Sequence, residues 1–253
     1  MANLTSKQYN AMKIISFLIP FVIVVLLIIL KIFSFKKYRV IVLREDGFIE
    51  DCTALLYFFS FIISILMYFD FKKNDSLLGF FSLILAIGFL FIGLEEISYG
   101  QRIFKIGTPS FLKAINAQRE LNLHNILRRY PLHFLYILVG FYGIFAKLII
   151  QKILKFKHKM VDYIAPDYFL ISYFFPVFIL YIYYDYLSPI LIYLYGDQFI
   201  WAMDDVEGFW LHAKDQEAVE FILSLGFFLF TINIKFKHIL SGKLSYHKYH
   251  CVP

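Results

Sequence analysis

The sequence predicts an all-α protein, a polytopic transmembrane helix bundle of about six spans. Two observations carry this prediction. Hydrophobic residues make up 60% of the 253 residues, well above their share in soluble domains. They also occur in long runs, and apolar runs of about 18 or more residues are typical of helices that cross a bilayer. We therefore expect one integral membrane domain over residues 1–253.

Six apolar runs have a length near the ~20 residues that a tilted transmembrane helix needs. They lie at 14–33, 52–69, 77–96, 131–150, 167–186 and 217–235. The first run is followed by the basic segment "KIFSFKKYR" and by no small-residue cleavage site. We therefore interpret it as a membrane anchor and not as a removed signal peptide.

A further segment, "ILIYLYGDQFIWAM", follows Asp185 and Pro189. It is apolar, but Gly196 and Asp197 interrupt it before it reaches the length of a span. We interpret it as an amphipathic or re-entrant segment at the membrane interface, and the alternative is a short seventh span.

This topology sorts the acidic residues between the two sides of the membrane. With six spans, both termini lie on one side together with the short, lysine-bearing loops. Of the nineteen acidic residues, that side holds only Asp70, Asp75, Asp162 and Asp167. The remaining acids lie on the other side in long, mixed loops or at the span ends next to them, so the polar segments can meet at one face of the bundle.

The net charge of +6 comes largely from lysines between the apolar runs, where they contact anionic headgroups. This predicts the lipid bilayer as a partner and no nucleic acid. The acid-poor lysine clusters around 152–159 and 235–248 favour a cytoplasmic position for their own side, although the basic residues after the first span favour the opposite. We expect the bacterial inner (plasma) membrane, with the acidic face extracytoplasmic. Cys52 and Cys251 lack metal or redox spacing.

The segment "GLEEISYGQR" ends the third run with two adjacent glutamates. Charged side chains next to hydrocarbon usually face a bundle interior and have a partner there. On a continuous helix Glu95, Ser98 and Arg102 share one face, while Glu96 points about 100° away. We predict Glu95, Glu96 and Arg102 as catalytic, with Arg102 as the countercharge of the glutamates, and Ser98 and Gln101 as substrate-binding. In the alternative, both glutamates are solvated among the headgroups and simply end the span.

The segment "QRELNLHN" follows "GTPSFLKAIN", which has the features of an amphipathic helix lying on the membrane. Glu120 and His124 are four residues apart and share a helical face. That spacing can hold a metal, or let a carboxylate orient an imidazole. We predict His124 as catalytic and Asn122 and Asn125 as substrate-binding. The alternative is an interfacial histidine exposed to water.

The remaining acids lie at the starts of two spans. Asp46 precedes Gly47 as a candidate helix N-cap, and Glu50 falls in the first turn. Glu217 and Glu220 share a face where the last span begins, and Glu220 is the deepest acid on that side. We predict supporting roles for Asp46, Glu50 and Glu217.

Carboxylates with one imidazole suit a divalent metal such as zinc, manganese or iron. We predict Glu96, His124 and Glu220 as its ligands. The same groups also suit general acid–base chemistry without a metal. The sequence contains no HExxH, no GxSxG and no phosphate-binding glycine loop, so no common catalytic motif selects a reaction.

Four segments together resemble an uncharacterised bacterial and archaeal family of multipass membrane proteins: "REDGFIEDCTALLYFF", "EEISYGQR", "NAQRELNLHN" and "EAVEFILSLG". Members look like R-E-D-G-x-x-E near the second span, E-E-I-S-W-G-Q-R after the third and N-L-H-N before the fourth. Tyr99 stands where tryptophan is expected. That family has no established activity, so the resemblance implies a membrane protein in which these segments recur, and no substrate.

Three functions fit these observations. The first is a metal-assisted hydrolase or transferase that acts on a lipid or lipid-linked substrate. The second is a proton- or cation-coupled transporter, and the third a non-catalytic membrane assembly or anchoring protein. Most acids lie at span ends and not at mid-bilayer, where transporter sites usually form, which favours the first function over the second.

Overall fold

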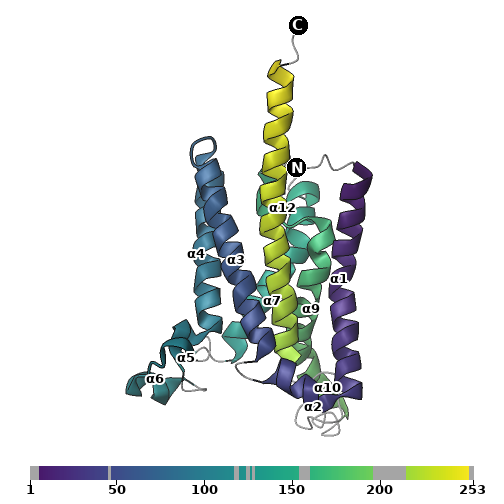
Figure 1. Cartoon of the computed structure of the whole chain (residues 1–253). Coiled ribbons are helices and arrows are strands. Elements are labelled where there is room, and N and C mark those ends of the chain that lie inside the picture. The colour runs from purple at the N-terminus through teal and green to yellow at the C-terminus, as the bar shows by residue number, and fades with distance from the viewer. Residues whose placement is uncertain are drawn as a thin grey trace.

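A computed structural model of the chain describes residues 6–44, 47–116, 120–123, 126, 129–153, 160–195 and 215–250. These residues form helices joined by turns and loops, with no β-strand among them (Figure 1). The all-α prediction is therefore confirmed. Six stretches of the described chain are long and apolar enough to cross a membrane: Lys7–Phe33, Phe35–Phe71, Ser76–Glu96, Pro131–Ile153, Val161–Leu194 and Gln216–Ile239. In a helix each span satisfies its own backbone hydrogen bonds, as hydrocarbon requires.

The long helices coincide with the predicted apolar runs to within several residues at most of their ends. They are α1 (Ser6–Phe33), α3 (Phe48–Phe71), α4 (Ser76–Glu96), α7 (Arg129–Leu148), α9 (Ile171–Ile182) and α12 (Gln216–His250). The shorter elements are α2 (Phe35–Tyr38), η1 (Arg39–Leu43), η2 (Ser98–Gly100), α5 (Gln101–Phe104), α6 (Ser110–Ile115), η3 (Ile149–Ile153), α8 (Val161–Ile164), η4 (Tyr168–Leu170), η5 (Tyr183–Leu187) and α10 (Ser188–Tyr195). Helix α12 continues well past the predicted end at 235, because extending a formed helix adds a hydrogen bond with each residue.

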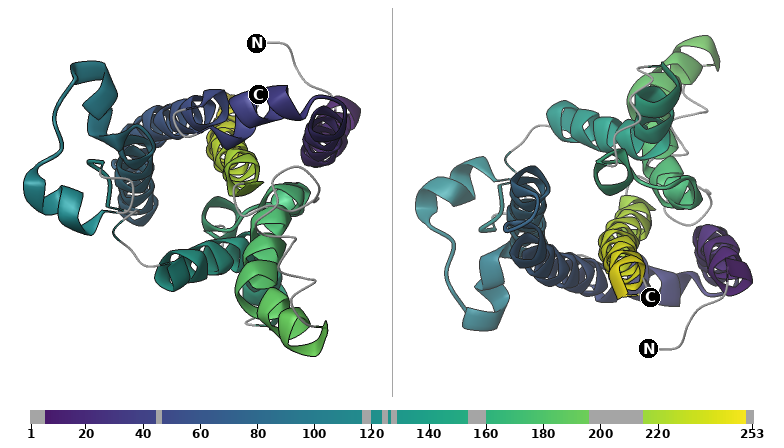
Figure 2. Two further views of the ribbon diagram at one scale, coloured as in Figure 1. Left: turned by 90° about the horizontal axis from the view of Figure 1, so that it is seen from below. Right: turned by 90° about the horizontal axis from the view of Figure 1, so that it is seen from above.

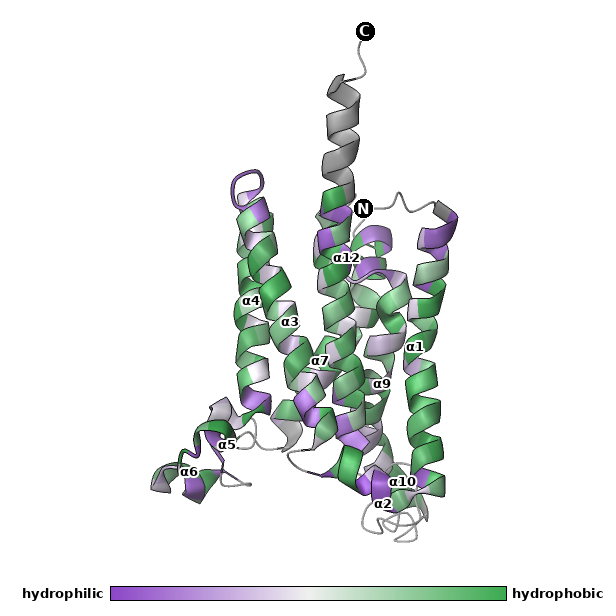
Figure 3. Ribbon diagram, in the orientation of Figure 1, coloured by the Kyte–Doolittle hydropathy of each residue, from purple (hydrophilic) through white to green (hydrophobic). Residues whose placement is uncertain are grey.

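Helix α12 occupies the centre of the bundle. It packs against α3 on one side and α9 on the other, while α4 pairs with α3 and α7 pairs with α9. The end-on views in Figure 2 show α12 between these two helix pairs, with α1 at the periphery. Of the most apolar stretch of each helix, 44% is buried in α12 and only 6% in α1. Helix α1 therefore presents most of its surface to lipid, as the hydrophobic colouring in Figure 3 illustrates.

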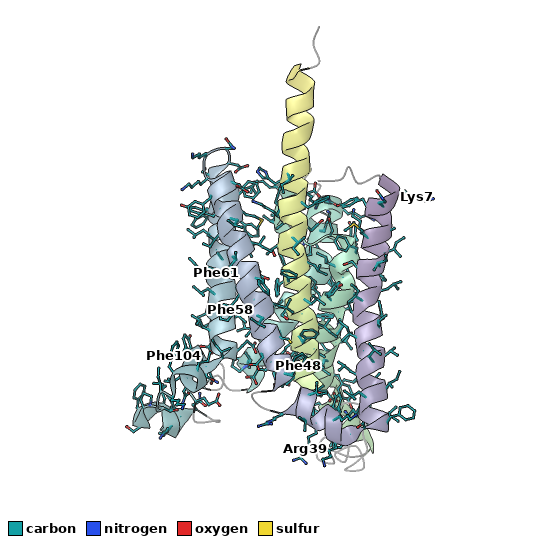
Figure 4. The ribbon with its side chains drawn as sticks, in the orientation of Figure 1. Lys7, Arg39, Phe48, Phe58, Phe61 and Phe104 are labelled. Atoms are coloured by element: carbon teal, nitrogen blue, oxygen red, sulfur yellow. The ribbon has the colours of Figure 1, made fainter. Side chains whose placement is uncertain are left out.

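The two ends of the bundle differ in their polar groups. The terminal end is where α1 begins, near Lys7, and the loop end carries Arg39 and Phe104 (Figure 4). At the terminal end Lys147 donates to both Asp162 and Asp167. Lys235 likewise pairs with Asp70. The predicted position of these aspartates beside the short lysine-bearing loops is confirmed.

The fifth span differs from the prediction, which ended it at 186 and expected a separate interfacial segment. The helix instead continues through the π-helical turn η5 into α10 and reaches Tyr195. The wider π turn lies directly before Pro189, where a proline ring would otherwise meet the carbonyl group of Asp185. Helix α10 has eight residues, and the described part of the segment therefore belongs to the end of the fifth span; a short seventh span stays a prediction. Residues 196–214 lie outside the described part.

The helix starts at the loop end also correct one expected cap. The N-cap of α3 is Gly47 and not the predicted Asp46. Asp46 itself lies outside the described residues. A Cβ atom at Gly47 would stand 2.5 Å from the carbonyl oxygen of Arg44, so a side chain has no room there. Glu50 is in the first turn of α3, as predicted.

Asp215 sits directly before α12 and joins that helix to the N-terminal part of the chain. Its carboxylate accepts hydrogen bonds from Lys31 Nζ and Tyr38 Oη, both at 2.6 Å. Lys31 belongs to α1 and Tyr38 to α2. The start of α12 is therefore held to α1 and α2 at the loop end.

Two glycines set how closely α7 and α9 approach. A Cβ atom on Gly140 would lie 2.7 Å from Phe178 Cβ, and one on Gly143 would lie 2.0 Å from Phe174 Cγ. Such small residues let helix backbones come together in membranes, where packing replaces the hydrophobic effect. This contact fixes the relative position of the two helices, which also carry polar residues of the candidate site.

Candidate acid–base site at the loop end

The helix that carries Glu95 and Glu96 stops directly after them. Residues Ser98, Tyr99 and Gly100 have φ angles of 46°, 54° and 75°, which place three consecutive residues in left-handed backbone and turn the chain. A Cβ atom on Gly100 would also stand 2.9 Å from the ring of Phe104. The prediction that Glu95, Ser98 and Arg102 share one continuous helical face is therefore wrong. Arg102 lies in α5, and its side chain is outside the described part.

Buried polar side chains hold the loop that follows. Ser98 Oγ donates to Glu120 Oε2 at 2.6 Å, and Asn122 Nδ2 donates to the same carboxylate oxygen at 3.0 Å. Asn116 Nδ2 donates to Asn122 Oδ1 at 2.8 Å. Ser98, Asn116 and Asn122 are all buried. We call Ser98, Asn116, Glu120 and Asn122 the loop network, and its bonds stabilise the left-handed turn.

Two more of the predicted residues brace the same loop. Gln101 Nε2 donates to Thr108 Oγ1 at 2.6 Å, and Gln101 Oε1 accepts from the Leu121 amide at 2.8 Å. Glu95 Oε2 accepts from the Leu123 amide at 2.7 Å. Ser98, Gln101 and Asn122 were predicted to bind substrate. The structure places them in bonds within the protein, and substrate binding by them stays a prediction.

The expected helical face of Glu120 and His124 is not formed. Residues 120–123 are bends and loop, because their side chains bond back to the turn after α4. Glu120 is therefore part of the loop network. His124 and Asn125 lie outside the described residues.

Glu96 belongs to a different environment from Glu95. Its strongest charge interactions are with Glu220, Glu217 and Glu50, which come from α12 and α3, and a weaker one is with its neighbour Glu95. We call Glu50, Glu96, Glu217 and Glu220 the carboxylate cluster. All four keep part of their surface accessible. Figure 3 shows hydrophilic residues at the loop ends of α3, α4 and α12, the three helices that carry these acids.

Tyrosines line the deep side of the carboxylate cluster. Tyr181 Oη donates to Glu220 Oε1 at 2.5 Å, and the Tyr136 hydroxyl also hydrogen-bonds to Glu220. The rings of Tyr136 and Tyr181 stack at 4.7 Å with an interplanar angle of 5°. Tyr57 is buried, and it interacts electrostatically with both Glu96 and Glu220. Phenol groups therefore hold Glu220 in place within the bundle.

Sequence reasoning missed a buried histidine–aspartate pair beside these tyrosines. His133 Nδ1 lies 2.9 Å and 3.0 Å from the two carboxylate oxygens of Asp185. The imidazole ring centroid is 4.6 Å from that of Tyr181. His133 is in the second turn of α7 and Asp185 is in η5. The available signal was an ionisable residue inside each of two apolar runs, which usually marks a paired group.

The metal prediction has no support from the described residues. Among them, no group of three His, Cys, Asp or Glu side chains is arranged to hold a metal ion. The predicted ligand set of Glu96, His124 and Glu220 depends on His124, which lies outside that part. A divalent metal therefore stays a prediction.

No family model, no curated protein and no solved structure matches the chain. The resemblance to a family of multipass membrane proteins is therefore untested. What the site can do follows from its geometry, which places several carboxyl groups, phenols and an oriented imidazole together at one end of a membrane bundle.

Proposed function

We propose that this protein is a membrane-embedded hydrolase or transferase that acts on a lipid or lipid-linked substrate at the loop end. One observation carries the proposal: Glu96 of α4 and Glu220 of α12 interact within a cluster of carboxylates, with Glu220 held by Tyr181. Placing like charges together near hydrocarbon is costly, and such residues usually serve a function.

The cluster suits acid–base catalysis. Hydrolysis or group transfer needs one group that takes the proton of the nucleophile and another that protonates the leaving oxygen. Neighbouring carboxyl groups can hold and release that proton. We therefore assign Glu96 and Glu220 to proton transfer, and Glu50 and Glu217 to the surrounding field. Glu95 is occupied by the Leu123 amide, which favours a structural role for it.

The position of the cluster favours a lipid substrate. Glu96 is the last residue of α4 and Glu220 is in the second turn of α12, so both lie near the depth where lipid headgroups join their acyl chains. The neighbouring segment exposes Phe104, Phe111 and Ile115 beside lysines, as interfacial segments do. This segment would hold the headgroup region close to the site.

Transport is the second candidate, and a specific observation favours it. The His133–Asp185 pair and Glu220 with its tyrosines are proton-carrying groups inside spans, as in proton-coupled transporters. These groups gather at the loop end, however, and the terminal end holds lysine–aspartate pairs instead. A path across the bilayer would need further groups between the two ends.

The decisive experiment compares lipids in cells with wild-type protein and with E96Q or E220Q. We expect a lipid species to change with wild-type protein, and the rate in purified nanodiscs to fall about 10²–10⁴-fold in either variant. D70N, which alters an acid at the terminal end, is the matched control and should behave as wild type. If the lipids are the same in cells with the wild type, E96Q, E220Q and D70N, the enzyme proposal is refuted. Proton flux in liposomes that only E220Q abolishes would favour transport, and intact phenotypes throughout would favour an assembly role.

Metal and orientation are tested separately. Metal analysis of purified wild-type and H124A protein should find zinc, manganese or iron lost in the variant, and no metal in either removes that idea. We also expect the loop end to lie on the extracytoplasmic side of the bacterial inner membrane. A cysteine in place of Lys113 should then react with an impermeant thiol reagent added to whole cells.

A further inference from the structure

The His133–Asp185 pair has the geometry of a carboxylate that orients an imidazole. Both Asp185 oxygens lie within 3.0 Å of His133 Nδ1, and both side chains are nearly enclosed, with exposed fractions of 10% and 5%. An ionised carboxylate there accepts the Nδ1 proton. The other ring nitrogen, Nε2, then carries the lone pair that can take up a proton.

The pair belongs to the same site as the carboxylate cluster. The His133 ring lies against Tyr181, with centroids 4.6 Å apart and an angle of 52°. The hydroxyl of Tyr181 donates to Glu220, so one aromatic ring separates the imidazole from the cluster. Tyr136, one turn along α7 from His133, stacks on the same ring. Contacts from α7, α9 and α12 therefore fix all these groups relative to one another.

The backbone around Asp185 positions its side chain toward α7. Asp185 lies in η5, the π-helical turn before Pro189, and η1 and η3 are π-helical as well. The turn itself follows from the proline, and its consequence for the site is that the Asp185 carboxylate meets His133 Nδ1.

We propose that His133 Nε2 is the proton acceptor of the site and that Asp185 is its positioning residue. This inference rests on the proposed function. It assigns to His133 the role of taking the nucleophile's proton and leaves to the carboxylate cluster the role of protonating the leaving oxygen. A water or hydroxyl loses its proton to Nε2 while its oxygen bonds to the carbonyl carbon or phosphorus of a lipid ester. The bond to the leaving oxygen then breaks, and a carboxyl group of the cluster protonates that oxygen. The imidazolium then returns its proton to that carboxylate, directly or through water, which restores both groups.

The test reads the imidazole directly. Protein labelled with ¹⁵N-histidine in nanodiscs should show His133 with its proton on Nδ1, the signal being assigned by its loss in H133Q. D185N should abolish that preference, and D185E should restore it. A proton on Nε2 in the wild type, or an unchanged tautomer in D185N, would overturn the inference. Unfolding of both D185N and D185E would make the pair structural and would also overturn it.

Turnover separates this inference from the function on which it rests. We expect H133Q to lose about 10²–10⁴-fold in rate, D185N to lose activity as well, and D185E to regain part of it. E220Q should lose activity while the His133 tautomer stays as in the wild type. Full turnover in H133Q overturns the assignment of His133 alone. Absence of turnover with every lipid overturns the proposed function, whatever the tautomer.

Discussion

The close approach of α7 and α9 can be tested by adding one methyl group, in the variant Gly143→Ala. The new Cβ would stand 2.0 Å, 2.2 Å and 2.6 Å from three carbon atoms of Phe174. Carbon atoms pack at about 3.5–4 Å, so the ring or the helix must move by more than an ångström. Phe174 is fully buried, and the core around it has no space to accept the shift. Such overpacking costs about 1–3 kcal/mol of the free energy of unfolding.

A matched glycine separates this cost from helix propensity. Gly88 is also helical, in α4, and a Cβ atom there meets nothing within 4 Å. Both substitutions gain about 1 kcal/mol of helix propensity, so the difference between them is the overpacking cost. With about 2–4 °C per kcal/mol for a chain of this size, we expect Gly143→Ala to melt roughly 2–12 °C below Gly88→Ala. Circular dichroism in nanodiscs measures both, and equal melting temperatures would refute the close approach.

Three further outcomes follow from other contacts. Asp167→Asn removes the carboxylate that Lys147, Lys237 and Asn233 all contact. Breaking such a buried ion pair should cost about 3–5 kcal/mol of the free energy of unfolding, and denaturant unfolding measures it. Asn122→Ala removes buried bonds of the loop network and should cost about 1–3 kcal/mol locally, seen as faster hydrogen exchange of the amides at 120–123 with the helices unchanged. Burial and a hydrogen bond to Glu95 raise the pKa of Tyr99 from 10.0 to about 12. The unfolded chain therefore releases this proton first, and stability should fall between those pH values; a melting temperature that falls equally in Tyr99→Phe would contradict this.

The six spans and the gathering of acids at one end could be predicted from the sequence. An apolar run in a bilayer has to satisfy its backbone hydrogen bonds internally, so length and composition alone indicate a helix. The order of spans then places their ends alternately on two sides. Glu96 and Glu220 were expected at the same face, and both lie at the loop end of the structure, near enough for their charges to interact.

The break after Glu96 could not be predicted in this way. Gly100 is the one local signal for left-handed backbone there, and a single glycine does not fix where a helix ends. At Ser98 the turn is favoured by the distant partners Glu120 and Asn122, which both bond to its hydroxyl. Three residues expected to bind substrate, Ser98, Gln101 and Asn122, have internal bonds. The sequence pattern placed them in the right region without indicating their contacts.

The membrane class, the spans and the acidic end were thus determined by the sequence alone, since each depends on interactions within one helix or on the order of helices. The pairing of His133 with Asp185, 52 positions apart, was decided only by the tertiary structure. It depends on the rotation of α7 against α9, which the fit of Gly143 against Phe174 sets. Packing between helices in a membrane is a long-range match of shapes, and no local pattern of residues encodes it.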